Sequence, residues 1–166
     1  MTLVKQRARG ILLSDTFAFT GTVTGAGKIL QVKTKLHSTE TGANNQDTET
    51  FNFEESIALS STSNKVLVIC NLAGLSNGGA GRMTGKIRWE TTSGGVTGTQ
   101  VVAASIAQDS FDTSGISDNS LSCLISPSTT STIYIKTTIQ KNDSGTQWYI
   151  QRYSSQSSMI LMEVSA

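Results

Sequence analysis

Residues 65–73 read KVLVICNLA, and this stretch decides the fold class. Apolar side chains occupy both alternating sets of positions, so a strand here would bury both of its faces. The run is short, rich in β-branched residues and followed by the glycine-rich GLSNGGAG, which favours a strand over a helix. The stretch therefore predicts a strand in the middle of a packed β-sandwich.

The segments on either side continue the same pattern. Residues 28–37, KILQVKTKLH, alternate apolar and polar side chains, which predicts a half-buried strand with one wet face. Residues 132–140 turn through KNDSG into 147–153, which predicts a β-hairpin. Residues 49–53 and 56–59 are expected to form a shorter pair of strands. Further strands are expected over 65–73, 82–92, 96–107, 121–125 and 159–164.

Composition agrees with an all-β chain. Ser and Thr together make up 46 of the 166 residues, and these residue types favour turns and pleated surfaces over helix interiors. Fifteen glycines and a single proline fit many strands joined by tight turns. Eight to ten strands in a chain of this length predict an antiparallel jelly-roll β-sandwich over residues 28–166.

Residues 1–27 differ from the rest and are expected to form an extended N-terminal arm. The first fourteen residues carry Lys5, Arg7 and Arg9 without an acidic residue, followed by an apolar patch of Ile11, Leu12 and Leu13. Fully extended, such a segment could reach about 90 Å and contact a neighbouring molecule. A solvated basic tail is an equally simple interpretation.

The sequence offers little for catalysis. His37 is the single histidine and is expected at the surface, while Cys70 and Cys123 lack metal-ligand spacing and are expected as buried thiols. None of the common hydrolase, metalloprotease or phosphate-loop motifs occurs. We therefore expect no enzyme activity and no cofactor. A net charge of +1 predicts neither a nucleic-acid nor a membrane partner, and no signal peptide is apparent, so assembly in a cytoplasm is expected.

Three segments of the sequence point to a particular protein family, which the composition alone does not. They are TSNKVLVICNLAGLSNGGAGRM at 62–83, SLSCLISPSTTSTIYIKTTIQ at 120–140 and GTQWYIQRYSSQSSMILMEVSA at 145–166. Together with GKILQV at 27–32, they resemble a module of phage virion surface proteins, found in head and fibre proteins of phages of aquatic bacteria. The resemblance covers about residues 28–166.

This resemblance implies a jelly roll like the tumour-necrosis-factor and complement globular-head domains, which associate around a threefold axis. The last strand would then lie near the axis of a homotrimer. The residues implied at that trimer interface are Trp148, Tyr149, Met159, Leu161 and Met162. Burial of the same strand between the protein's own two sheets is the alternative, and the two do not exclude each other.

Fibre proteins of this kind carry a long shaft before the module, and this sequence has only the arm. The expected function is therefore that of a capsid decoration, or cement, protein on the outer surface of the virion. Its partner would be the major capsid protein, and the docking residues would be Lys5, Arg7, Arg9, Ile11, Leu12 and Leu13. The alternative is a short fibre tip that recognises a host glycan through loops 76–81 and 141–145.

Overall fold

Ten strands and one short 3-10 turn form the part of the chain that the structure describes. The computed structural model describes residues 27–43, 47–77, 82–108, 117–142 and 147–166. The elements are β1 (Ile29–His37), β2 (Thr41–Ala43), β3 (Glu49–Ile57), β4 (Lys65–Asn77), β5 (Arg82–Glu90), β6 (Thr99–Gln108), β7 (Ser117–Ile125), β8 (Ile133–Lys141), β9 (Trp148–Ile150), the turn η1 (Arg152–Ser154) and β10 (Ser157–Val164). The arm predicted over 1–27 lies outside the described residues except for Gly27.

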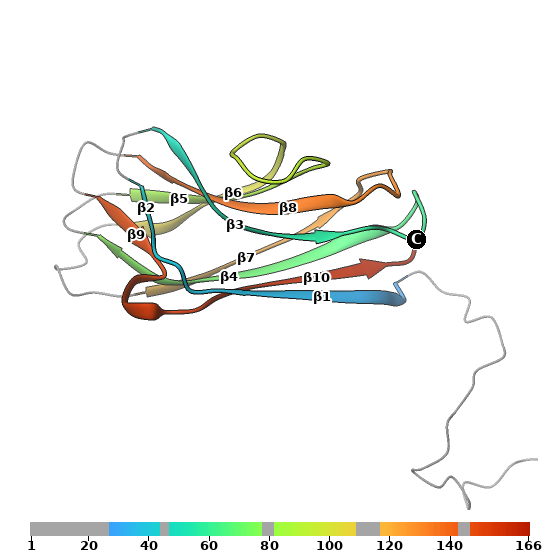
Figure 1. Ribbon diagram of the computed structural model, residues 1–166, viewed down its shortest axis with the longest axis horizontal. Helices are drawn as coiled ribbons and strands as arrows, with labels where there is room; N and C mark the ends of the chain where they lie inside the picture. Colours follow the sequence, from blue (N-terminus) through green and yellow to red (C-terminus); the bar gives the residue numbers. More distant parts are fainter. Residues whose placement is uncertain (1–26, 44–46, 78–81, 109–116, 143–146) are drawn as a thin grey trace, which may run out of the picture.

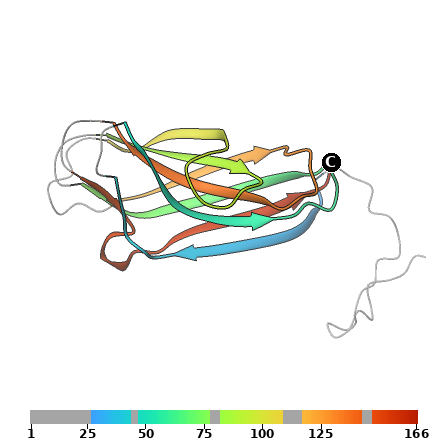
Figure 2. The ribbon, with the colours of Figure 1, turned by 45° about the horizontal axis from the view of Figure 1, so that its top comes forward.

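The strands build two antiparallel sheets that pack face to face (Figures 1 and 2). In the first sheet, β10 lies between β1 and β4, and β7 pairs with the other edge of β4. The short strands β2 and β9 pair with each other at one end of this sheet. The second sheet has the order β3-β8-β5-β6. The chain passes repeatedly between the sheets, and its first and last long strands lie side by side. This order is that of a jelly roll, so the predicted fold class is confirmed.

Strand β4 is a central strand, as its sequence predicts, but the expectation that both of its faces would be buried was wrong, because Ile69 on the outer side is 37% exposed. It pairs with β10 on one edge and with β7 on the other. Val66, Val68 and Cys70 point inward and are fully buried between the sheets. They meet the inner side of the second sheet, where Ile133 and Ile135 of β8 are also fully buried. The core therefore lies along the middle strands of both sheets.

Two local predictions were wrong. The segments 132–140 and 147–153 do not form a hairpin, because β8 pairs with β3 and β5 while β9 pairs with β2 and β4. The connection between them crosses from one sheet to the other. Residues 49–57 form one strand, β3, with a register shift between Phe51 and Phe53, and not two short ones.

Strand β1 also differs from expectation, since its apolar side faces outward. Val32 and Leu36 are 51% and 60% exposed. The reason is the register with β10, in which Gln31 pairs with the buried Glu163. The Gln31 Nε2 donates a hydrogen bond of 2.6 Å to Glu163 and must therefore point inward, which turns Val32 to the opposite side. The outward side of β1 is consequently apolar, and the other side is also exposed at Lys33 and Lys35.

Candidate interaction surface

The outer side of the first sheet is apolar across all four long strands. Val32, Met162, Leu67 and Leu124 are consecutive register partners from β1, β10, β4 and β7, so they form one transverse row. Ile160 and Ile69 pair directly in the adjacent row. We call this surface the apolar face. Its apolar members are Ile29, Val32, Leu36, Leu67, Ile69, Leu124, Ile160, Met162 and Val164.

Nothing in the described part of the chain covers the apolar face. Leu124 is 53% exposed and Ile69 37%, although β4 is the central strand of its sheet. Charged side chains on this side, Lys65 and Asp118, lie at opposite ends, and none of the described outward positions between them is charged. A contiguous exposed apolar surface of this kind marks an interaction site.

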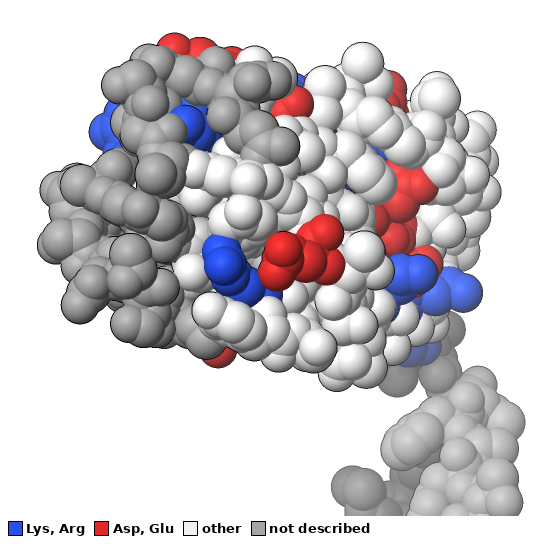
Figure 3. All heavy atoms as spheres, turned by 60° about the vertical axis from the view of Figure 1, so that its left-hand side comes forward, with Lys and Arg blue, Asp and Glu red and all other residues white. Residues whose placement is uncertain are grey.

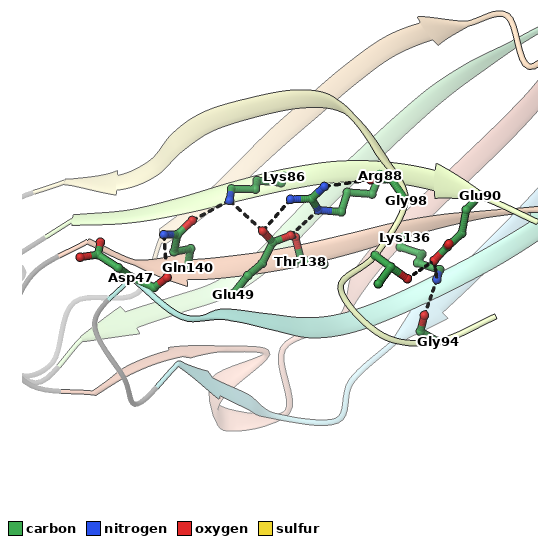
Figure 4. Close-up of polar contacts among 11 residues, drawn as sticks. Asp47, Glu49, Lys86, Arg88, Glu90, Gly94, Gly98, Lys136, Thr138 and Gln140 are labelled. Atoms are coloured by element: carbon green, nitrogen blue, oxygen red, sulfur yellow. Dashed lines mark hydrogen bonds and ion pairs between the residues drawn. The ribbon is translucent and has the colours of Figure 1, made fainter. Parts of the chain in front are cut away.

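The outer side of the second sheet has the opposite character. Glu49, at the start of the edge strand β3, pairs with Arg88 at 2.5 Å and with Lys86 at 2.8 Å, and it accepts a hydrogen bond from Thr138 (Figure 4). Lys86 also donates to Gln140. Burial by itself would raise the pKa of Glu49, but the hydrogen bonds from Arg88, Lys86 and Thr138 outweigh burial and hold that pKa at about 2.

The segment 91–98 folds over one end of this polar cluster. Lys136, which is fully buried, donates to the Glu90 carboxylate and to the Gly94 carbonyl (Figure 4). Glu54 in turn accepts hydrogen bonds from Ser93 and from the Gly94 N–H. Glu49, Glu90 and Lys136 are thus paired within the chain, and Glu54 is hydrogen-bonded, so this side does not expose an apolar surface that a partner would have to cover.

Charge over the rest of the visible surface gathers in small clusters of both signs (Figure 3). This distribution fits the net charge of +1 and gives no broad field for steering an oppositely charged partner. The asymmetry between the two sheets is therefore one of polarity, and it identifies the first sheet as the candidate interaction surface.

The five side chains expected at the trimer interface lie in different environments in the structure. Trp148, Met159 and Leu161 are at most 1% exposed and belong to the protein's own core, in line with the alternative interpretation of the last strand. Met162 points the other way and lies in the central row of the apolar face. Tyr149 is half-buried on the outer side of β9. An interface on this sheet would thus include Met162 and exclude the three core residues.

Most of the apolar face was missed by sequence reasoning. Val32 and Leu36 were assigned to a buried side, and Leu67 and Leu124 were not singled out. The available signal was the doubly apolar pattern of KVLVICNLA together with the alternation of KILQVKTKLH. The docking residues predicted between Lys5 and Leu13 lie outside the described residues.

The described residues offer no site for metal chemistry. They contain no group of three or more His, Cys, Asp or Glu side chains that could hold a metal ion. His37 stacks on Phe53 with 5.0 Å between ring centroids, and burial together with Lys35 lowers its pKa. Burial also raises the pKa of Cys70 to about 12, so this thiol stays protonated. The part of the chain that the structure describes holds no helix long and apolar enough to span a membrane.

Comparison with known proteins leaves the family open. No family model matches the chain, and no curated protein matches it. Among solved structures, the VP2 subviral particle of infectious bursal disease virus matches with a TM-score of 0.45 and 16% identity, over 81% of this chain and 32% of that one. T=1 particles derived from the same virus give a TM-score of 0.48 and 14% identity, over 92% and 41%.

A third match is of a different kind. Disulfide-linked pili of Bacillus endospore appendages give a TM-score of 0.39 and 16% identity, over 85% of this chain and 96% of that one. The chain spans less than half the length of the two viral structures. All three scores lie below 0.5, so they carry no argument about function, and the jelly-roll assignment depends on the strand order alone.

Proposed function

We propose that the chain is a non-enzymatic structural protein of a virion, which associates with copies of itself through the apolar face. The observation that supports this proposal most directly is the row Val32–Met162–Leu67–Leu124 on the outer side of the first sheet. Side chains of this kind exposed over four strands would cause non-specific aggregation unless a partner covered them. The virion itself is inferred from the resemblance of the sequence to phage surface modules.

Copies of the same chain suit this face better than another protein does. Obligate homomeric interfaces are the most hydrophobic class, whereas contacts that form after folding carry more charge. The apolar face has charges only at its ends, Lys65 and Asp118, so two copies can meet without opposing like charges at the centre. The threefold arrangement implied by the resemblance would place Met162, in β10, close to the axis.

The proposed role of the trimer is that of a decoration, or cement, protein on the outside of the capsid, with the major capsid protein as its partner. Strand β1 begins at Ile29, close to Ser165 near the C-terminus, whose carbonyl accepts a hydrogen bond from the Gly27 N–H at 3.2 Å. Three arms would therefore leave a trimer from the same end of the sandwich. Weak contacts from three tethered arms combine into a durable attachment.

The stabilising mechanism would be cross-bridging. Each bound trimer adds contacts that must break before neighbouring capsomers can separate under internal pressure. The basic residues Lys5, Arg7 and Arg9 and the apolar patch at 11–13 are the segment proposed to contact the shell. Assembly would take place in the host cytoplasm, without nucleic acid, membrane or cofactor.

The test is an occupancy measurement on capsids that lack the protein. Purified full-length protein and a variant without residues 1–14 are added to such capsids, and the bound copies are counted by quantitative mass spectrometry. We expect hundreds of full-length copies per capsid, a higher temperature of capsid rupture, and little binding of the truncated variant. Equal occupancy by both proteins would refute the docking role of the arm.

A fibre tip that recognises a host glycan is the second candidate. Its specific support is Tyr153, which is 66% exposed in the turn η1 and does not lie in a strand as expected. The loops first considered for this role, 76–81 and 141–145, lie partly outside the described residues. Copy number separates the two functions, because a few copies to a few dozen per virion would favour the fibre.

A further inference from the structure

The turn between β9 and β10 presents an aromatic and cationic platform. The Arg152 guanidinium carbon lies 4.1 Å from the centroid of the Tyr149 ring and 5.3 Å from that of Tyr153. The Tyr149 hydroxyl donates to Gln147 at 2.6 Å, which fixes that ring. Tyr153 is the most exposed large hydrophobic side chain among the described residues, at 66%. Three flat groups therefore lie together, and one of them is mostly open to solvent.

The backbone of this turn is held in an unfavourable conformation. Gln151, Tyr153 and Ser154 have φ angles of 58°, 55° and 61°, in the left-handed region that non-glycine residues rarely adopt. Such strain persists only where the surroundings enforce it, and it concentrates at functional sites. A relaxed turn with glycine at these positions would be the simpler way to connect the two strands.

Buried contacts enforce the conformation. The Gln151 N–H donates to the Ala73 carbonyl at 2.9 Å, and the Gln151 side chain is 1% exposed, with its amide 2.7 Å from the Ser157 hydroxyl. Gly74 packs so closely against the turn that an added Cβ would lie 2.6 Å from the Ser155 Cβ. The turn is thus anchored on strand β4, and Tyr153 projects from a rigid base.

The guanidinium of Arg152 is available for a ligand. It makes no hydrogen bond or ion pair with any described residue beyond its contacts with the two rings. Stacking on Tyr149 leaves the edge of the guanidinium, which carries the N–H donors, free to bind a carboxylate through two parallel hydrogen bonds. The electron-rich face of the Tyr153 ring attracts groups with partial positive charge, such as the C–H face of a sugar ring.

We infer that Tyr153, Arg152 and Tyr149 form a binding site for an acidic saccharide, in which a uronic-acid ring stacks on Tyr153 and its carboxylate binds Arg152. The inference goes beyond the proposed shell role. Saccharide binding can be measured on the purified protein alone, whereas shell attachment requires the arm and the capsid. Saccharide binding and capsid occupancy are measured separately, so one can fail while the other holds.

The test is a titration of the full-length protein with a trimer of galacturonic acid and with the neutral trimer cellotriose, followed by calorimetry or NMR. We expect the acidic trimer to bind at least about tenfold more tightly. Y153A should weaken its binding by about tenfold or more, while Y153F, which keeps the ring, should stay within about twofold of the unmodified protein. R152Q should remove the preference for the acidic trimer. Y134A is the matched control on the second sheet and should change nothing.

One further variant separates loss of the site from loss of the fold. Y153G relieves the left-handed strain, so the unfolding temperature should stay equal or rise while saccharide binding is lost. The inference would be overturned if neither trimer bound at millimolar concentration, if both bound equally well, or if Y153A bound the acidic trimer as the unmodified protein does. A loss in Y134A equal to that in Y153A would also overturn it.

Discussion

Glu163 anchors one end of the sandwich, and its replacement by glutamine tests how the two sheets are joined. The carboxylate is 1% exposed and points inward from β10. It accepts hydrogen bonds from the Ser60 N–H and hydroxyl at 2.7 Å each, from Asn64 Nδ2 at 2.6 Å and from Gln31 Nε2 at 2.6 Å. The last strand is thereby tied to the first strand and to the β3–β4 connection.

The contribution of Glu163 to the free energy of unfolding follows from the pKa of its carboxyl group. Burial alone would raise the pKa of Glu163, but the hydrogen bonds from Ser60, Asn64 and Gln31 outweigh burial and lower it from 4.5 to about 2. A difference of this size corresponds to roughly 3 kcal/mol of stability, since one pKa unit is about 1.4 kcal/mol. Because the pKa is lower in the folded protein, this contribution is complete above about pH 4.5 and is lost as the pH falls towards 2.

The assay is urea unfolding at fixed protein concentration, at pH 7 and at steps between pH 5 and 2. We expect E163Q to lower the free energy of unfolding by about 3 kcal/mol at pH 7, because its amide N–H groups face donors. Its stability should also fall less steeply than that of the unmodified protein below pH 4.5. The exposed Glu40 supplies the control E40Q, which should stay within about 0.5 kcal/mol. An unchanged acid dependence in E163Q would refute the reasoning.

Three further predictions concern single residues. K136A should lower the unfolding temperature by several degrees, because it leaves a cavity and unpaired acceptors in place of a buried ammonium. K136M, which fills the cavity, should lower the unfolding temperature less. Equal losses in the two variants would contradict this prediction. G74A should destabilise by more than about 2 kcal/mol, and G94A, at a similar positive φ with open space around it, by about 1 kcal/mol, as urea unfolding would show. Cys70 should resist thiol reagents at pH 8 in the folded protein and react on unfolding. Labelling of Cys70 before Cys123 in the folded protein would contradict the burial of Cys70.

The fold class was readable from the sequence because a short run that is apolar at both alternating sets of positions is typical of a central strand, although the structure buries only one of its two faces. KVLVICNLA has no polar alternate set, and the structure places it at the centre of the first sheet. The jelly-roll topology followed from the number of strands and the absence of helical segments. What the pattern does not encode is which sheet each strand joins. The residues between 140 and 147 resemble a hairpin turn, yet the chain crosses there to the opposite sheet.

The interaction surface was harder to predict, for a physical reason. In MILMEV, residues 159–164, every side chain except Glu163 is apolar, so the sequence does not show which alternate set faces the core. The polar partners of Glu163 determine which side of the last strand faces the core. The carboxylate needs the donors Gln31, Ser60 and Asn64, which come from distant parts of the chain. Once Glu163 points inward, Met162 must point outward.

The turn at Tyr153 was missed because the sequence gives no sign of it. Non-glycine residues in the left-handed region are enforced by tertiary contacts, here by Gly74 and the buried Gln151. QWYIQRY alternates in a way that is typical of a strand, and it does form one until Ile150.

Sedimentation velocity of the purified protein tests the central claim, that copies of the chain associate through the apolar face. The decisive variant is V32S/L124S, which changes two side chains that are 51% and 53% exposed and therefore little needed for folding. V96S, at an exposed apolar position in the segment that covers the second sheet, is the control. We predict a trimer at micromolar concentration for the unmodified protein and for V96S, and a folded monomer for V32S/L124S. A monomeric unmodified protein, or a double variant that still sediments as a trimer, would contradict the account.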